Sequence, residues 1–119
     1  MIMNEKEQNK SFYDLVVKMR RFQKSYFATQ DRNFLEKELK PLEAECDRRL
    51  ENERVTFPPA VKFRNAVFSM RVWQRTYFQT FTEESIKQAR RWEKTVDKWI
   101  LRTEEIIKEK EQPTLKFEG

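Results

Sequence analysis

Residues 12–29 read FYDLVVKMRRFQKSYFAT, and residues 63–80 read FRNAVFSMRVWQRTYFQT. The two stretches align without a gap, and eight of the aligned positions are identical. The identical pairs are Phe12/Phe63, Val16/Val67, Met19/Met70, Arg20/Arg71, Gln23/Gln74, Tyr26/Tyr77, Phe27/Phe78 and Thr29/Thr80. Because unrelated helices would not share this many positions, we interpret the chain as two tandem copies of a unit of about forty residues.

The correspondence continues further along the chain, after one extra residue in the first copy. Glu43 and Asp47 then align with Glu93 and Asp97. The extra residue falls in the segment that contains Pro41, and a proline inside a helix removes a backbone hydrogen bond. We therefore expect a local distortion around Pro41.

Apolar residues recur in each copy with the spacing of two helices. The first helix of each copy has the interval pattern 3-4-3-4, at Phe12, Leu15, Met19, Phe22 and Tyr26, and at Phe63, Ala66, Met70, Trp73 and Tyr77. This spacing is typical of a helix that packs along an antiparallel neighbour. Turns are expected near residues 29–31 and 80–82, where Asp31 and Thr82, or alternatively Thr80, suit helix N-caps. Thr80 with Glu83 fits a capping box. The sequence predicts an all-α, four-helix bundle-like protein made of two duplicated antiparallel helical hairpins.

Proline residues indicate the boundaries within this single domain of 119 residues. We place hairpin 1 at about residues 12–54, a proline-containing linker at 55–59 and hairpin 2 at about 60–111. Residues 112–119 contain another proline and are expected to form a mobile tail.

The composition argues against an enzyme. The chain has no histidine, and its one glycine is Gly119, so glycine-rich phosphate loops and dinucleotide-binding motifs are excluded. The one cysteine, Cys46, occupies an apolar helical position and is expected to be buried. No segment approaches the ~18 apolar residues that a membrane span needs. We expect a cytoplasmic protein with no cofactor, no metal site and no membrane contact.

The shared motif is MR-x-x-Q-[KR]-[ST]-YF-x-T, followed by a glutamate and then an aspartate four residues later. This motif resembles a group of short uncharacterised helical proteins of bacteria, which often lie near phage or conjugative elements and usually carry one copy. The second copy fits the motif better, since the first has the extra residue and Pro41. The resemblance implies a helical hairpin and no particular activity.

The repeated charged residues are candidates for ion pairs. Counting along the helices places Arg20 at the height of Glu43 within hairpin 1, and Arg71 at the height of Glu93 within hairpin 2. We therefore expect two cross-helix ion pairs that fix the register of each hairpin, while a binding role for the arginines remains the alternative. Asp47 and Asp97 are expected to be structural acceptors or exposed charges.

Charge is unevenly distributed along the chain, which has 25 basic and 20 acidic residues. Residues 55–80 contain four basic residues and no acidic residue, and the first helix of hairpin 1 is also basic. These helices could pair with the more acidic second helices. Alternatively, they could form a nucleic-acid face, which would consist of Arg20, Arg21, Lys24, Arg64, Arg71 and Arg75.

The third predicted helix also has apolar residues on the side opposite its packing seam. Val61, Phe68 and Val72 lie there, and they predict an association surface, most simply of a homodimer. Burial beneath the tail or the Phe57 linker is the alternative. The sequence thus favours a non-catalytic protein-interaction or assembly module that binds itself or another protein. A nucleic-acid-binding accessory protein of a mobile element is the second interpretation.

Overall fold

The computed structural model describes residues 4–111, and this part of the chain is helical and contains no strand. The elements are α1 (Glu5–Thr29), α2 (Arg32–Phe34), the π-helix η1 (Leu35–Leu39), α3 (Lys40–Asn52), α4 (Pro58–Thr80) and α5 (Glu83–Glu111). Their packing confirms the predicted all-α, bundle-like fold class. The tail predicted at residues 112–119 lies outside the described residues.

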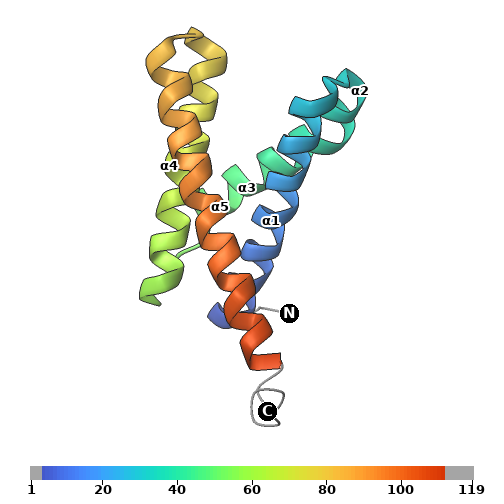
Figure 1. Cartoon of the computed structure of the whole chain (residues 1–119). Helices are drawn as coiled ribbons and strands as arrows, with labels where there is room; N and C mark the ends of the chain where they lie inside the picture. The colour runs from blue at the N-terminus through green and yellow to red at the C-terminus, as the bar shows by residue number, and fades with distance from the viewer. Residues whose placement is uncertain (1–3, 112–119) are drawn as a thin grey trace.

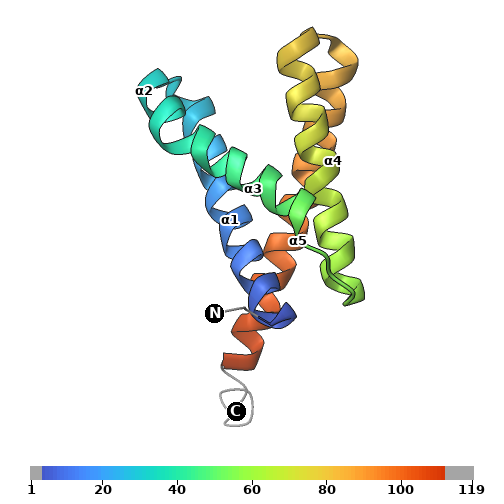
Figure 2. The same cartoon turned by 180° about the vertical axis from the view of Figure 1, so that it is seen from behind.

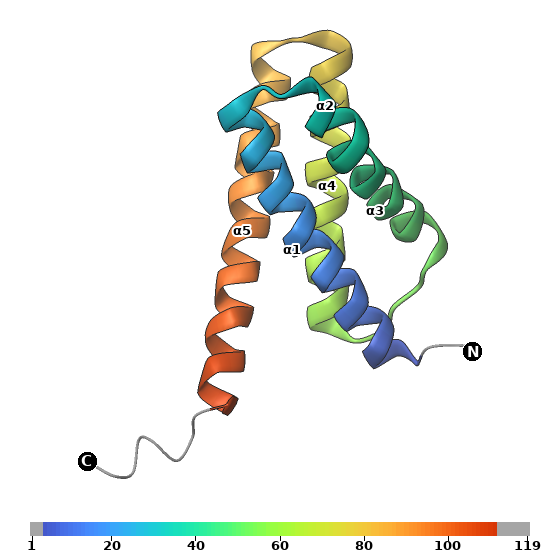
Figure 3. The same ribbon diagram turned by 90° about the vertical axis from the view of Figure 1, so that its right-hand side faces the viewer.

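Two helical arms diverge from a common base (Figures 1 and 2). One arm consists of α1 with the continuous segment α2–η1–α3, and the other consists of α4 and α5. From the side, α1 runs obliquely across the α4–α5 pair (Figure 3). The bundle is therefore open at the end that carries the two tight turns.

The two tight turns have the same backbone geometry. Gln30 closes α1 in the left-handed region at φ 55°, and Phe81 closes α4 there at φ 51°. Asp31 and Thr82 then cap the helices that follow, because the Asp31 side chain accepts the Asn33 and Phe34 amides and the Thr82 hydroxyl accepts the Ser85 amide. The predicted turn positions are confirmed, as are the N-caps Asp31 and Thr82. The alternative cap, Thr80, instead donates its hydroxyl to the Thr76 carbonyl within α4.

The extra residue of the first copy is taken up by η1. A π-helical turn contains one more residue than an α-helical turn, and the Lys40 amide accordingly bonds to the Leu35 carbonyl. Pro41 follows in the first turn of α3, where its missing N–H is least costly. The distortion expected around Pro41 is thus confirmed as a single π-helical turn.

The core lies where the two arms cross. Val16 and Met19 of α1 and Val67 and Met70 of α4 are completely buried there. Cys46 of α3 is also fully buried, as predicted, and this burial raises the pKa of its thiol to about 12. Other residues of the predicted first-helix seam, among them Leu15, Phe22 and Tyr26, are only partly buried around this core.

Candidate functional site

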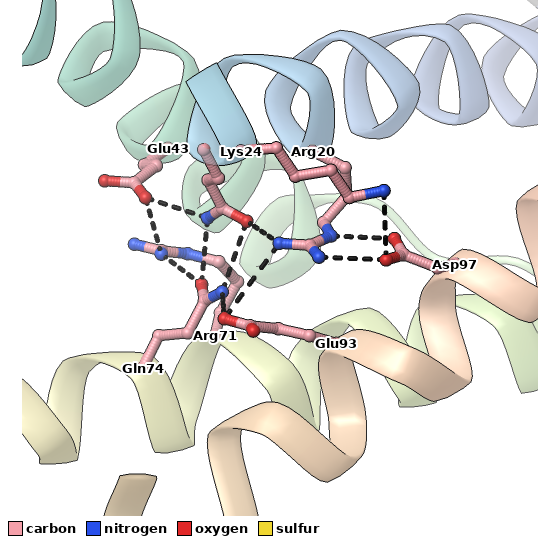
Figure 4. A network of polar contacts seen from close by, with 8 residues as sticks. Arg20, Lys24, Glu43, Arg71, Gln74, Glu93 and Asp97 are labelled. Atoms are coloured by element: carbon pink, nitrogen blue, oxygen red, sulfur yellow. Dashed lines mark hydrogen bonds and ion pairs between the residues drawn. The ribbon is translucent and has the colours of Figure 1, made fainter. Parts of the chain in front are cut away.

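Two bidentate ion pairs join the arms at the crossing, and Figure 4 shows the one between Arg20 and Asp97. The Nε and Nη2 atoms of Arg20 donate to the carboxylate of Asp97 at 2.8 and 3.0 Å. Arg71 makes the same two contacts with Asp47, also at 2.8 and 3.0 Å. Each arginine of one hairpin therefore binds an aspartate of the other hairpin.

The ion-pair partners predicted within each hairpin are wrong. Arg71 lies 3.2 Å from Glu43, and Arg20 lies 3.9 Å from Glu93, so the two glutamates are exchanged between the hairpins. Counting residues along a helix gives the height of a side chain but not the neighbour that its face meets. Both arginines lie on the faces that meet at the crossing, and they reach across it.

Gln23 and Gln74 occupy the centre of this network. The Gln23 amide donates to Gln74 at 3.0 Å, and the Gln74 amide donates back at 3.2 Å. Each glutamine also accepts a hydrogen bond from the arginine three residues before it, at 2.6 and 2.7 Å. The second amide hydrogens go to Glu43 and Glu93 of the same hairpins, at 2.8 and 2.7 Å. The contacts are thus reciprocal, as a nearly two-fold arrangement of the arms requires.

The network also changes the pKa of Asp97. Partial burial alone would raise the pKa of Asp97, but the hydrogen bonds and charge of Arg20, with those of Lys24, outweigh burial. The pKa of Asp97 therefore lies below its ordinary value of 3.8. The charged form is stabilised, and the ion pair holds the arms together at neutral pH.

The candidate nucleic-acid face on the first helices is not exposed as a unit. Arg20, Arg64 and Arg71 are only 5–6% exposed and are engaged in ion pairs. Lys24 and Arg75 reach the surface, but they pair with Asp97 and Asp47. Arg21 is exposed. Because half of the set is buried, these six residues cannot contact one ligand together.

A cleft of about 480 Å³ lies between the arms, with the central network among its lining residues. Its apolar lining comes from both arms and consists of Tyr26, Phe27, Leu35, Leu39, Tyr77, Phe78, Ile86 and Ala89. Phe27 and Phe78 occupy identical positions of the two copies and are 54% and 58% exposed. The basic residues Arg32, Lys40 and Arg75 also line the cleft.

The candidate association surface lies elsewhere, on α4. Phe68 is 51% exposed, while Val61 and Val72 are half-buried. Phe57 of the linker is itself 59% exposed, while Val55 of the linker lines a surface hollow together with Val61 and Phe68. Association through these three residues remains a prediction.

Of the two roles expected for Asp47 and Asp97, the structure confirms that of structural acceptors. Sequence reasoning missed their arginine partners and the cleft. The presence of an aspartate at the same position of both copies, Asp47 and Asp97, was the available signal for a shared contact. The Tyr-Phe pairs that precede each turn did not indicate the cleft, because a helical pattern in the sequence does not reveal how far two arms diverge.

No protein-family model matches the chain, and comparisons with curated proteins and with solved structures give no match either. Within residues 4–111, no group of three or more cysteine, aspartate or glutamate side chains is placed to hold a metal ion. None of the helices in this range is long and apolar enough to cross a membrane. The functional proposal therefore rests on the geometry of the cleft and of the polar network.

Proposed function

We propose that the protein is a non-catalytic protein-interaction module that binds an apolar segment of another protein in the cleft between its arms. The observation that carries this proposal is the pair Phe27 and Phe78, which line the cleft from the two arms while more than half of each remains exposed. Exposed aromatic residues gathered in one hollow are typical of protein-binding surfaces.

The polar network supports this function by fixing the distance between the arms. Gln23, Gln74 and Arg71 line the cleft and are also joined to one another by hydrogen bonds. A cleft with fixed walls needs little ordering when a ligand enters, and this lowers the entropic cost of binding. The network thus preforms the site.

The lining also suggests the chemistry of the partner. Apolar walls facing each other across a cleft suit an amphipathic helix, which inserts apolar side chains spaced three and four residues apart. Arg32 lines the cleft and has no carboxylate partner within residues 4–111. We therefore propose a partner helix with an apolar stripe and an acidic residue beside it.

Binding without catalysis agrees with the state of the reactive groups. Glu43 and Glu93 line the cleft, but each already accepts a hydrogen bond from a glutamine and lies near an arginine. Cys46 is buried and its pKa of about 12 keeps the thiol protonated. Such groups are suited to holding a structure rather than to transferring protons.

A display library of amphipathic helical peptides tests the proposal. Peptides selected on the wild-type protein are measured against Phe27→Ala/Phe78→Ala and against Phe57→Ala, which removes an exposed phenylalanine outside the cleft. We expect at least a tenfold loss of affinity for the cleft variant and no change for the control. Failure to select any peptide, or equal affinity for wild type and the cleft variant, would overturn the proposal.

A further inference from the structure

The outward face of α5 carries an exposed basic stripe that neither the cleft nor the central network uses. The stripe consists of Lys87, Arg90, Arg91, Lys94, Lys98 and Arg102. At about 100° per residue, these positions fall within an arc of about 120° on one side of the helix. Five of them surround a shallow surface hollow together with Ile86 and Thr95.

The tertiary structure separates these basic residues from the acidic residues of the same stretch. Between Ser85 and Thr103 the only acidic residues are Glu93 and Asp97. Both face the crossing of the arms, where Asp97 binds Arg20 and Lys24, and Glu93 accepts from Gln74. The inward carboxylates are thus neutralised by other helices, and the stripe keeps its positive charge.

The basic residues of the stripe lack ion-pair partners in the part of the chain that the structure describes. None of its six residues forms an ion pair within residues 4–111, whereas Lys10, Lys40 and Arg48 each pair with a carboxylate on their own element or a neighbouring turn. Arg91 lies over the ring of Trp92, at 5.9 Å from its centroid. The six cations extend over about 22 Å of helix. A row of positive charge of this length is complementary to an extended polyanion.

We propose that this stripe binds the sugar-phosphate backbone of a nucleic acid without reading its sequence. Phosphates repeat regularly along a duplex, so the row of cations on α5 can contact several of them. Lysine and arginine side chains neutralise phosphates without contacting the bases. An anionic membrane is disfavoured because a surface-bound helix must insert an apolar face. On the inward side of α5, Ala89 and Val96 are buried against the bundle. Leu101 is the one exposed apolar residue between Lys87 and Arg102, and Ile106 and Ile107 are exposed only beyond the stripe, so the stripe has no continuous apolar face to insert.

Fluorescence anisotropy with a labelled random-sequence 30-bp duplex, a 30-nucleotide single strand and phosphatidylserine vesicles tests this proposal. For the wild type we expect duplex binding whose log affinity falls with log salt with a slope of about −3 to −5. The variant Arg91→Gln/Lys94→Gln/Lys98→Gln should lose more than tenfold in affinity and flatten the slope by about 2–3.

The control variant Lys6→Gln/Lys37→Gln/Arg54→Gln removes the same net charge from exposed positions on other elements. It should keep at least a third of the wild-type affinity, and circular dichroism checks that all variants fold. No binding to either nucleic acid at 50 mM salt, equal loss in both variants, or tighter binding to vesicles than to nucleic acid would overturn the proposal. The peptide affinity of the cleft should be unchanged in both variants, so this test is independent of the proposed function.

Discussion

Gln23 and Gln74 hydrogen-bond to each other in both directions at the centre of the molecule, with amide-to-carbonyl distances of 3.0 and 3.2 Å. They occupy the same position in the two copies of the repeated unit. Both are nearly fully buried, so each lost bond leaves a polar atom without a partner. This reciprocal pair links the two arginine–carboxylate clusters into one network and sets the angle at which the arms cross.

Replacing one member of the pair should be costly. Gln74→Met removes the amide that Gln23 and Arg71 use, and leaves Glu93 with an unmet acceptor. We expect the free energy of unfolding to fall by about 1–3 kcal/mol, measured by urea denaturation. The control Gln79→Met changes an exposed glutamine, and its effect should stay within about 0.5 kcal/mol. Equal effects would contradict the central role of the pair.

Arg71 and Asp47 should be energetically coupled across the two hairpins. A double-mutant cycle with Arg71→Ala and Asp47→Ala is expected to give about 0.5–3 kcal/mol of coupling, because both partners lose a mostly buried bidentate contact. The matched cycle with Glu93→Ala should give a smaller value, since no direct ion pair joins Arg71 and Glu93. A coupling energy between Arg71 and Glu93 larger than that between Arg71 and Asp47 would contradict the pairing across the hairpins.

Acid should weaken the crossing of the arms. The pKa of Asp97 is lowered in the folded protein, because Arg20 outweighs the effect of burial. The ion pair therefore contributes its full stability above the ordinary pKa of 3.8 and loses it as the pH falls further through the lower folded value. Unfolding free energies measured between pH 2.5 and 7 should show this loss of stability. In Asp97→Asn the loss between neutral and acid pH should be smaller, because the titrating carboxylate is absent. An unchanged pH profile in Asp97→Asn would contradict the assignment, with Asp14→Asn as an exposed control.

Cys46 should report on the integrity of the core. Its thiol is fully buried and its pKa is raised to about 12, so little thiolate is present or accessible at neutral pH. We expect an aromatic disulfide reagent to react with the native protein at least a hundredfold more slowly than with protein in 6 M guanidinium chloride. The exposed Ser25→Cys variant provides the fast reference, and a native rate close to that reference would contradict burial of Cys46.

The α4 surface is expected to support a homodimer. Phe68→Glu with Val72→Glu should convert a dimeric wild type into a folded monomer, because Phe68 is half-exposed and its replacement removes apolar contact area. Sedimentation velocity at 10–200 µM measures this change. A wild-type chain that sediments as a monomer at the highest concentration would rule the homodimer out.

The amino-acid sequence by itself determined the local structure. The 3-4 spacing around Met19 and Met70 gave the helices, and Asp31 and Thr82 gave their starting points. The extra residue before Pro41 indicated a distortion, which is the π-helical turn of η1. Each of these features depends on neighbours within a few residues, so a local pattern is enough to predict it.

Only the tertiary structure decided which residues meet. Arg71 binds Asp47 rather than a carboxylate of its own hairpin, because partner choice depends on the angle at which the helices cross. The same angle opens the cleft between Phe27 and Phe78, and it turns Asp97 inward while the basic stripe of α5 faces outward. A helical repeat gives the face on which a side chain lies, but the neighbour of that face is set by the packing of the whole chain.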